Sequence, residues 1–207
     1  MDDSLSPVLK ELVDAGWLNN TLVVLVSDHG ENLYEKVNTY EKEHVYETSS
    51  HIPLVLRVPG ETQGSEWHGL VSLVDIAATL YAYSSVRPPG HISGVSLLSE
   101  TSRSADTTDW IYVEGLDGRS RGYARAVLFA DGGKYIRDGA GREELYDLRA
   151  DPRELHNLSG VGSALSAYRS RFEQIVANMD ERRSRAFGVE DLPKETVEQL
   201  KALGYVH

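Results

Sequence analysis

Residues Thr21-Leu-Val-Val-Leu-Val-Ser27, followed directly by Asp28-His29-Gly30, decide the fold class of this chain. The run is β-branched and almost wholly apolar, which is typical of a strand buried on both faces, as in a parallel sheet. Asp28 and His29 lie just past its carboxyl end, which is the edge where ligands bind in open α/β sheets. The sequence therefore predicts a ligand site at this strand end.

The segments around this run alternate between helix-like and strand-like patterns. Apolar residues recur at helical spacing before Gly16, and a second apolar run closes at Pro59-Gly60. The order strand, loop, strand, helix is typical of α/β architecture. In chain order we expect a helix over 4–15, a loop over 31–43, a short helix over 46–50, a strand over 52–58 and a helix over 71–83.

The sequence changes character after Ser84. Stretches rich in Pro, Gly, Ser and Thr at 87–90 and 99–108 are typical of linkers and surface loops, and Gly132-Gly133 predicts a tight hairpin. Short strands are expected over 110–114, 124–130, 134–137 and 144–148, and helices over 163–183 and 194–203. The predicted organisation is an α/β core over 1–98, an antiparallel subdomain over 99–160 and C-terminal helices over 161–207.

Composition excludes several classes of function. The formal net charge of -11 repels phosphate backbones, so nucleic acid is not an expected partner. No stretch approaches the ~20 apolar residues that a membrane span requires. The chain has no cysteine, which excludes disulfides, thiolate metal sites and a nucleophile made from cysteine.

Asp28 and His29 are the residues with the clearest chemical potential. A carboxylate and a neutral imidazole are good ligands for a divalent cation. Adjacent side chains on a strand point to opposite faces, so both reach one ion only where the strand breaks, and Gly30 is expected to supply that break. The residues alone leave open a second interpretation, a turn with a capping aspartate and a solvated histidine.

Several segments resemble the sulfatase family of the alkaline phosphatase superfamily. Ser27-Asp-His-Gly-Glu31 resembles the family's metal motif, and Tyr46-Glu-Thr-Ser-Ser-His-Ile-Pro53 resembles the start of the segment that follows it. The resemblance continues in order over 71–80, 94–98, 144–158 and 199–206. It implies an alkaline-phosphatase-like α/β fold with a mixed or parallel sheet and helices, truncated at the N-terminus, plus a small antiparallel α+β C-terminal subdomain.

The resemblance also implies roles for individual residues. Asp28 and His29 would ligate the active-site metal, usually calcium in sulfatases, with zinc or manganese expected in a phosphoester relative. Lys42, four positions before Tyr46, matches the lysine that contacts the sulfate oxygens, and it is the candidate catalytic and substrate-binding residue. A compact ammonium with three donors suits developing negative charge. Lys36 is a weaker competitor for this role.

Other polar residues receive weaker expectations from the resemblance. His44 is a candidate substrate-binding residue, standing in for a histidine just before the Tyr-Glu pair of related enzymes, with a surface histidine as the alternative. His51 is expected to be a packing residue or to support the metal ligands from behind. Lys134 and the loop from Glu114 to Arg121 could reach the site by family analogy, and an ordinary strand is the alternative for Lys134.

The chain departs from the family pattern in two respects. Tyr34-Glu-Lys-Val-Asn-Thr-Tyr-Glu41 stands where many members have a Gly-Glu-His-Gly run. The Cys/Ser-x-Pro/Ala-x-Arg motif that yields the formylglycine nucleophile does not occur, and neither does the family's N-terminal pair of metal-binding aspartates. Met1-Asp2-Asp3 resembles a mid-domain segment, so we expect a fragment, a split enzyme or a mis-started gene.

These departures lead to expectations about the isolated chain. Two protein ligands cannot fill the six to eight positions of calcium, so metal binding is expected to be weak. Without the nucleophile no covalent intermediate forms, and the isolated chain is expected to be inactive. Uncovered sheet edges favour association, either with the missing N-terminal half of the domain or with another copy.

The predicted function is part of a sulfuric ester hydrolase that acts on a sulfated small molecule or glycan. Two alternatives stay open: a phosphodiesterase, phosphonate hydrolase or phosphoryl transferase of the same superfamily, and a non-catalytic binding module. The sequence does not name the substrate or the compartment. A periplasmic or secreted location would require a signal peptide in the full-length protein.

Overall fold

The computed structural model divides into two compact units, residues 1–160 and 161–207. The predicted boundary near residue 98 stays a prediction. The residues described are 2–36, 40–41, 45–88, 90, 92–98, 108–117, 122–185 and 193–202.

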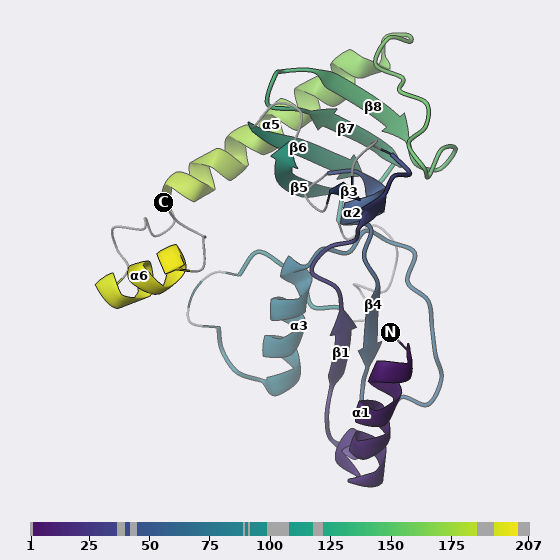
Figure 1. The fold of residues 1–207 in the computed structure, drawn as a ribbon, viewed down its shortest axis with the longest axis vertical. Helices are drawn as coiled ribbons and strands as arrows, with labels where there is room; N and C mark the ends of the chain where they lie inside the picture. The colour runs from purple at the N-terminus through teal and green to yellow at the C-terminus, as the bar shows by residue number, and fades with distance from the viewer. Residues whose placement is uncertain are drawn as a thin grey trace. The chain divides into compact units, whose positions relative to one another are not determined.

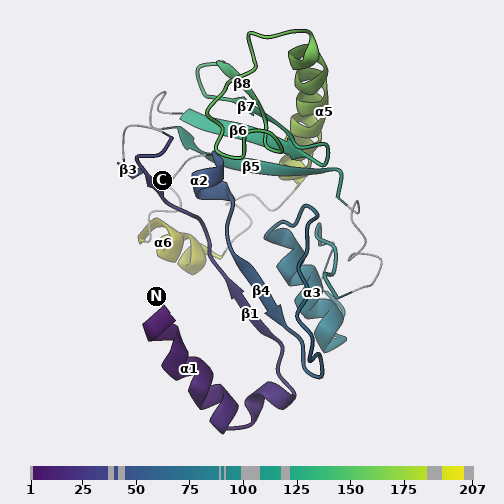
Figure 2. The same ribbon diagram turned by 90° about the vertical axis from the view of Figure 1, so that its right-hand side faces the viewer.

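The first unit opens with a helix, α1 (Asp2–Asp14), and a short 3₁₀ turn, η1 (Trp17–Asn19), that lead into a strand pair. Strand β1 (Val23–Val26) pairs with β4 (Leu54–Arg57), and the two lie side by side in both views (Figure 1, Figure 2). The sequence predicts three helices and two strands before residue 84, and all five are confirmed.

The predicted environment of β1 is wrong. The strand was expected to be buried on both faces of a parallel sheet, but β1 and β4 run antiparallel, with Val24 opposite Leu56. Leu25 and Val26 remain 44% and 36% exposed. Parallel neighbours need a crossover connection, usually a helix, whereas this connection turns back through a hairpin and one helical turn. Strand composition alone reports apolar character and not the direction of the partner.

The predicted loop over 31–43 contains a small hairpin. Strand β2 (Asn32–Leu33) pairs antiparallel with β3 (Tyr40–Glu41). The short helix α2 (Glu47–Ser50) then precedes β4. Two-residue strands are too short to leave an alternating pattern, which explains why the sequence did not reveal them.

Helix α3 (Val74–Ser84) is fastened to the segment after it by buried polar groups. Asp75 accepts hydrogen bonds from the backbone N–H groups of Ser72 and Val95, at 2.8 and 2.9 Å. Thr79, fully buried, donates to the Asp75 carbonyl and accepts from the Leu97 N–H. These bonds satisfy buried donors and fix the end of the predicted core segment on the helix.

The four predicted short strands form one antiparallel meander in the order β5-β6-β7-β8. Gly132, with φ of 92°, makes the turn between β6 and β7, as predicted from the glycine pair. The sheet contributes most of the buried apolar side chains, and Val45 and Tyr46, just before α2, pack in the same cluster. The strand bounds are Trp110–Asp117, Gly122–Phe129, Gly133–Arg137 and Glu143–Asp147.

The second unit contains the two predicted helices, α5 (Ala164–Arg185) and α6 (Lys194–Ala202). Across the described ranges, no helix combines the length and the apolar character that crossing a bilayer requires.

Candidate active site

The turn after β1 brings the two predicted metal ligands together. Asp28 Oδ2 lies 3.7 Å from His29 Nε2, and the Asp28 side chain is 88% exposed. His29 Nδ1 lies 2.8 Å from the carbonyl oxygen of Gly30. Because a carbonyl only accepts, this bond places the imidazole proton on Nδ1 and leaves the lone pair on Nε2, the atom that faces the carboxylate.

The turn itself is held by α2. The Gly30 N–H donates to the Ser49 carbonyl at 2.8 Å, and Ser27 Oγ donates to the His29 carbonyl at 2.6 Å. A Cβ at Gly30 would lie under 3.0 Å from the Thr48 carbonyl oxygen. Gly30 was expected to break the strand, and β1 does end before it, at Val26. Its φ is not positive, and glycine is needed there because the strand end lies against α2.

The donor set fits part of a divalent-metal site. Ligand atoms lie about 2.0–2.6 Å from a bound divalent ion, so two ligands of one ion are commonly ~3–4 Å apart. The Asp28–His29 separation falls in this range. Over the described parts of the chain, no group of three or more His, Asp or Glu side chains gathers in metal-binding geometry. The pair thus fits as two ligands of an ion and does not form a complete site.

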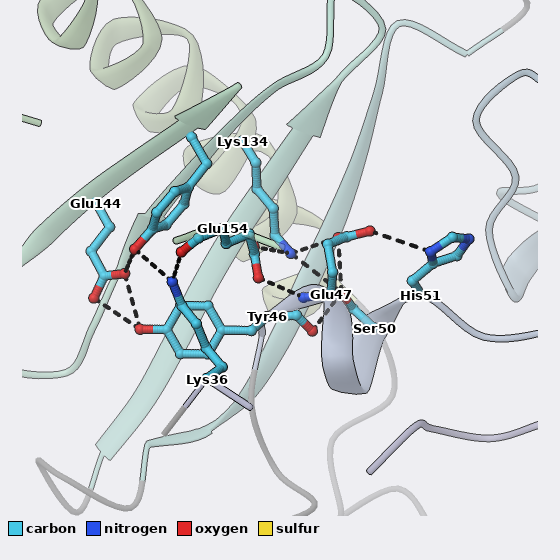
Figure 3. Close-up of polar contacts among 9 residues, drawn as sticks. Lys36, Tyr46, Glu47, Ser50, His51, Lys134, Glu144 and Glu154 are labelled. Atoms are coloured by element: carbon cyan, nitrogen blue, oxygen red, sulfur yellow. Dashed lines mark hydrogen bonds and ion pairs between the residues drawn. The ribbon is translucent and has the colours of Figure 1, made fainter. Parts of the chain in front are cut away.

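A buried ion cluster includes the first and last residues of α2 (Figure 3). Lys134, on β7, is fully buried, and its Nζ lies 2.7 Å from Glu47 Oε1 and 3.3 Å from Ser50 Oγ. Its 2.9 Å contact with Glu154 Oε1 is an ion pair rather than an aligned hydrogen bond. Burial raises the pKa of the Glu154 carboxyl above its usual range, and the Lys134 ammonium partly offsets that rise.

Lys36 occupies a second cluster, beside the first (Figure 3). Its ammonium lies 4.8 and 4.2 Å from the ring centroids of Tyr46 and Tyr146, and it donates to the Tyr146 hydroxyl and the Glu154 carbonyl. Glu144 accepts from both tyrosine hydroxyls. Desolvation lowers the pKa of Lys36 although nearby carboxylates oppose the effect. The Lys36 side chain therefore connects the β2–β3 hairpin with β8.

A cavity of about 460 Å³ lies between α2, β4 and the sheet. Glu47, His51 and Lys134 form its polar wall, and the larger apolar wall includes Trp67 and Ile111. Among the described residues that line it, Asp28 and His29 do not occur. The Lys134 ammonium in this wall already has three oxygen partners, on Glu47, Ser50 and Glu154.

The other predicted site residues have different outcomes. Lys42 and His44 lie outside the described residues, so their roles stay predictions. His51 is not a packing residue: its side chain is 81% exposed, with Nδ1 3.8 Å from Glu47 Oε2. Glu114 was expected to end a strand and to begin the loop over 114–121; it lies within β5, which continues to Asp117, and its carboxylate accepts from the Tyr112 hydroxyl at 2.5 Å. Residues 118–121 lie outside the described residues.

Sequence reasoning missed Glu47 and Glu154 and underestimated Lys134. Lys134 stands at a strand position with no exposure, and its two carboxylate partners are 87 and 20 positions away in the sequence. The one indication in the sequence was a lysine within the apolar run Gly-Lys-Tyr-Ile, because a lysine in a buried strand almost always requires a charged partner. The sequence did not indicate which partner that would be.

Comparisons with known proteins agree with the resemblance. Residues 1–86 match the family model described as Sulfatase. Arylsulfatase K of Xenopus laevis is 35% identical over 173 residues, which cover 77% of this chain and 32% of that protein. The Homo sapiens arylsulfatase K is 34% identical, with 76% and 31% covered. The chain therefore spans about a third of the length of the curated relatives it matches.

Solved structures support the same assignment. BT4656, in complex with its substrate D-glucosamine-2-N,6-O-disulfate, matches with a TM-score of 0.73 and 25% identity, covering 89% of this chain and 39% of its own. The phosphonate monoester hydrolase of Agrobacterium radiobacter shares the fold, with a TM-score of 0.68, 23% identity, and 87% and 39% covered. The predicted fold class is confirmed, and the chain belongs to the sulfatase family of the alkaline phosphatase superfamily.

Proposed function

We propose that this chain supplies the metal-binding and sulfate-binding part of a sulfuric ester hydrolase. The observation that supports the proposal is the strand-end pair, in which Asp28 Oδ2 and His29 Nε2 face each other at 3.7 Å. Membership of the sulfatase family and similarity to arylsulfatase K support sulfate esters as the substrate class. By analogy with BT4656, whose substrate is a disulfated glucosamine, the substrate would be a sulfated small molecule or glycan.

In this proposal Asp28 and His29 hold a divalent cation, and calcium is the ion expected for the family. A bound cation would supply positive charge that stabilises negative charge at the sulfuryl oxygens. The Gly30 carbonyl keeps the proton of His29 on Nδ1, so that Nε2 presents its lone pair to the ion. Asp28 contributes the negative charge that a hard divalent ion requires.

Lys42 is the residue proposed to contact the sulfate oxygens, with His44 nearby in sequence as a further substrate-binding candidate. The contacts of Lys36 support this choice, because its ammonium already stacks on two tyrosine rings and donates to Tyr146 and Glu154. Moving Lys36 to an anion would break these interactions.

We further propose that the isolated chain does not turn over sulfate esters. It contains no Cys/Ser-x-Pro/Ala-x-Arg motif and therefore no residue that becomes formylglycine. Covalent catalysis requires such a nucleophile, and the metal pair alone does not replace it. Likeness to the phosphonate monoester hydrolase concerns the fold and does not favour a phosphonate substrate.

Sulfate binding and turnover test these proposals in one series. Titration of the chain with sodium sulfate in excess calcium should show binding that Lys42→Met removes and the matched variant Lys36→Met retains. Loss of binding in Lys36→Met alone would contradict the assignment of Lys42. A fluorogenic aryl sulfate should not be hydrolysed by the pure chain, and hydrolysis that Asp28→Ala abolishes would contradict the proposed inactivity.

A further inference from the structure

A continuous series of contacts connects the buried lysine of the sheet with the metal pair. Lys134 on β7 binds the side chains of Glu47 and Ser50, the first and last residues of α2. Helix α2 in turn accepts the Gly30 N–H through its Ser49 carbonyl at 2.8 Å. Gly30 then accepts from His29 Nδ1 at 2.8 Å. Each step is a short polar contact between described residues.

The first residue of α2 is fixed from two directions. Glu154 Oε2 accepts the backbone N–H of Glu47 at 2.9 Å, while the Glu47 side chain accepts from Lys134. Glu154 has a φ of 54°, a conformation that favours glycine, and its carboxylate is almost fully buried. A non-glycine residue in this region persists only where its surroundings determine it. The strained backbone of Glu154 thus places its carboxylate where it accepts the Glu47 N–H.

The close packing of α2 on the turn leaves little freedom for independent movement. A Cβ at Gly30 would lie under 3.0 Å from the Thr48 carbonyl oxygen and 3.3 Å from Ser49 Cα. Displacement of α2 would therefore also displace Gly30, whose carbonyl accepts the hydrogen bond from His29 Nδ1–H. Groups that orient a metal-binding imidazole from behind commonly control the affinity of the site.

We propose that Lys134 is a positioning residue for the Asp28–His29 pair, acting through Glu47 and α2 on the tautomer and orientation of His29. This inference rests on the proposed metal-binding function of that pair. Lys134 itself does not contact the metal or the sulfate in this account, since its ammonium is held by Glu47, Glu154 and Ser50.

The test uses the full 207-residue chain and two variants. In Lys134→Met/Glu154→Gln the ammonium is lost, while the glutamine can still accept the Glu47 N–H and position 154 carries no buried charge without its partner. The Glu47 carboxylate, 18% exposed, keeps the hydrogen bond from Ser50 Oγ. Asp138→Asn is the matched control. The buried Asp138 carboxylate, just after β7, accepts hydrogen bonds from the backbone N–H groups of Ala140 and Arg142 and from the Arg142 side chain. The substitution therefore weakens the same sheet at a place away from α2. Folded variants are compared at a temperature well below unfolding.

Two readouts are taken for each variant. The affinity for Mn²⁺, a probe that accepts carboxylate and imidazole ligands, is measured by water-proton relaxation. Imidazole ¹³C shifts report which nitrogen of His29 carries the proton. We expect the double variant to lose about tenfold in Mn²⁺ affinity and to show mixed tautomers, while Asp138→Asn keeps the wild-type affinity and the Nδ1–H tautomer.

Unchanged affinity and tautomer in the double variant would overturn the proposal, as would an equal loss in Asp138→Asn. If the wild-type chain shows no Mn²⁺ binding that depends on Asp28, the proposed metal function fails. The tautomer then decides the positioning role by itself: a shift confined to the double variant supports it, and a tautomer that does not change contradicts it.

Discussion

Replacing Gly30 by alanine should destabilise the first unit because the new methyl group has no space. The added Cβ would lie under 3.0 Å from the Thr48 carbonyl oxygen and 3.2 Å from the Thr48 carbonyl carbon. Both neighbours are backbone atoms, so no side-chain rotation relieves the overlap. The strand end must then move away from α2 and stretch the 2.8 Å hydrogen bond from Gly30 to Ser49.

The size of the effect follows from three contributions. Overpacking a tight contact costs about 1–3 kcal/mol, and weakening one backbone hydrogen bond costs about 1 kcal/mol. The reduced freedom of the unfolded chain offsets about 0.4–1 kcal/mol when alanine replaces glycine. The expected net loss in the free energy of unfolding is therefore about 1–3.6 kcal/mol. With an m-value near 2 kcal/mol/M, the urea midpoint should fall by roughly 0.5–1.8 M.

Urea unfolding followed by tryptophan fluorescence measures this loss. All three tryptophans, Trp17, Trp67 and Trp110, lie in the first unit, so their emission reports its unfolding. Gly64→Ala is the matched control, because a Cβ at Gly64 has no atom within 4 Å and its φ is not positive. Equal midpoints for Gly30→Ala and Gly64→Ala would refute the claim that the strand end is packed against α2.

Three further changes test the clusters around α2. Lys134→Met alone should cost about 3–5 kcal/mol in urea unfolding, because Glu154 stays buried without its ammonium partner; a loss under about 1 kcal/mol would contradict this. Burial raises the pKa of Glu154, so its folded form holds a proton to higher pH than the unfolded form. The stability that this proton contributes is present below the ordinary glutamate pKa of about 4.3 and is lost as pH rises through the raised pKa of the folded form. Glu154→Gln should therefore flatten the fall in the urea midpoint above pH ~4. Midpoints that fall equally with pH in the variant and in the wild-type chain would contradict this prediction. Glu144→Gln should cost about 1–2 kcal/mol, because a charged acceptor for the Tyr46 and Tyr146 hydroxyls is replaced by an amide; an unchanged midpoint would exclude this role.

The sequence predicted most elements because their signals are local. The apolar run before Asp28, the helical spacing over 71–83 and the glycine pair at Gly132-Gly133 each act within a few residues, and each element formed where it was expected. The direction of β1 relative to β4 was not predictable, since it depends on a connection without periodic structure. The same limit hid the two-residue strands β2 and β3.

The candidate site shows the same division. The proximity of Asp28 and His29 follows from their adjacency at the end of a strand, and their role as metal ligands stays a prediction. The contact between Gly30 and α2 was not predicted, because it is a tertiary contact that no local pattern records. Lys134 and Glu154 meet across loops and strands, so their ion pair also required the folded chain.

A divalent-metal titration of the wild-type chain and of Asp28→Asn tests the central claim most directly. The account predicts that Ca²⁺ binds the wild-type chain weakly, with a dissociation constant of roughly 1 mM or above, as expected for an incomplete ligand set. It also predicts that Ca²⁺ shifts the side-chain carboxyl resonance of Asp28, and that binding is lost in Asp28→Asn. Equal calcium binding by the two proteins, with no change at Asp28, would contradict the assignment of the strand-end pair as a metal site.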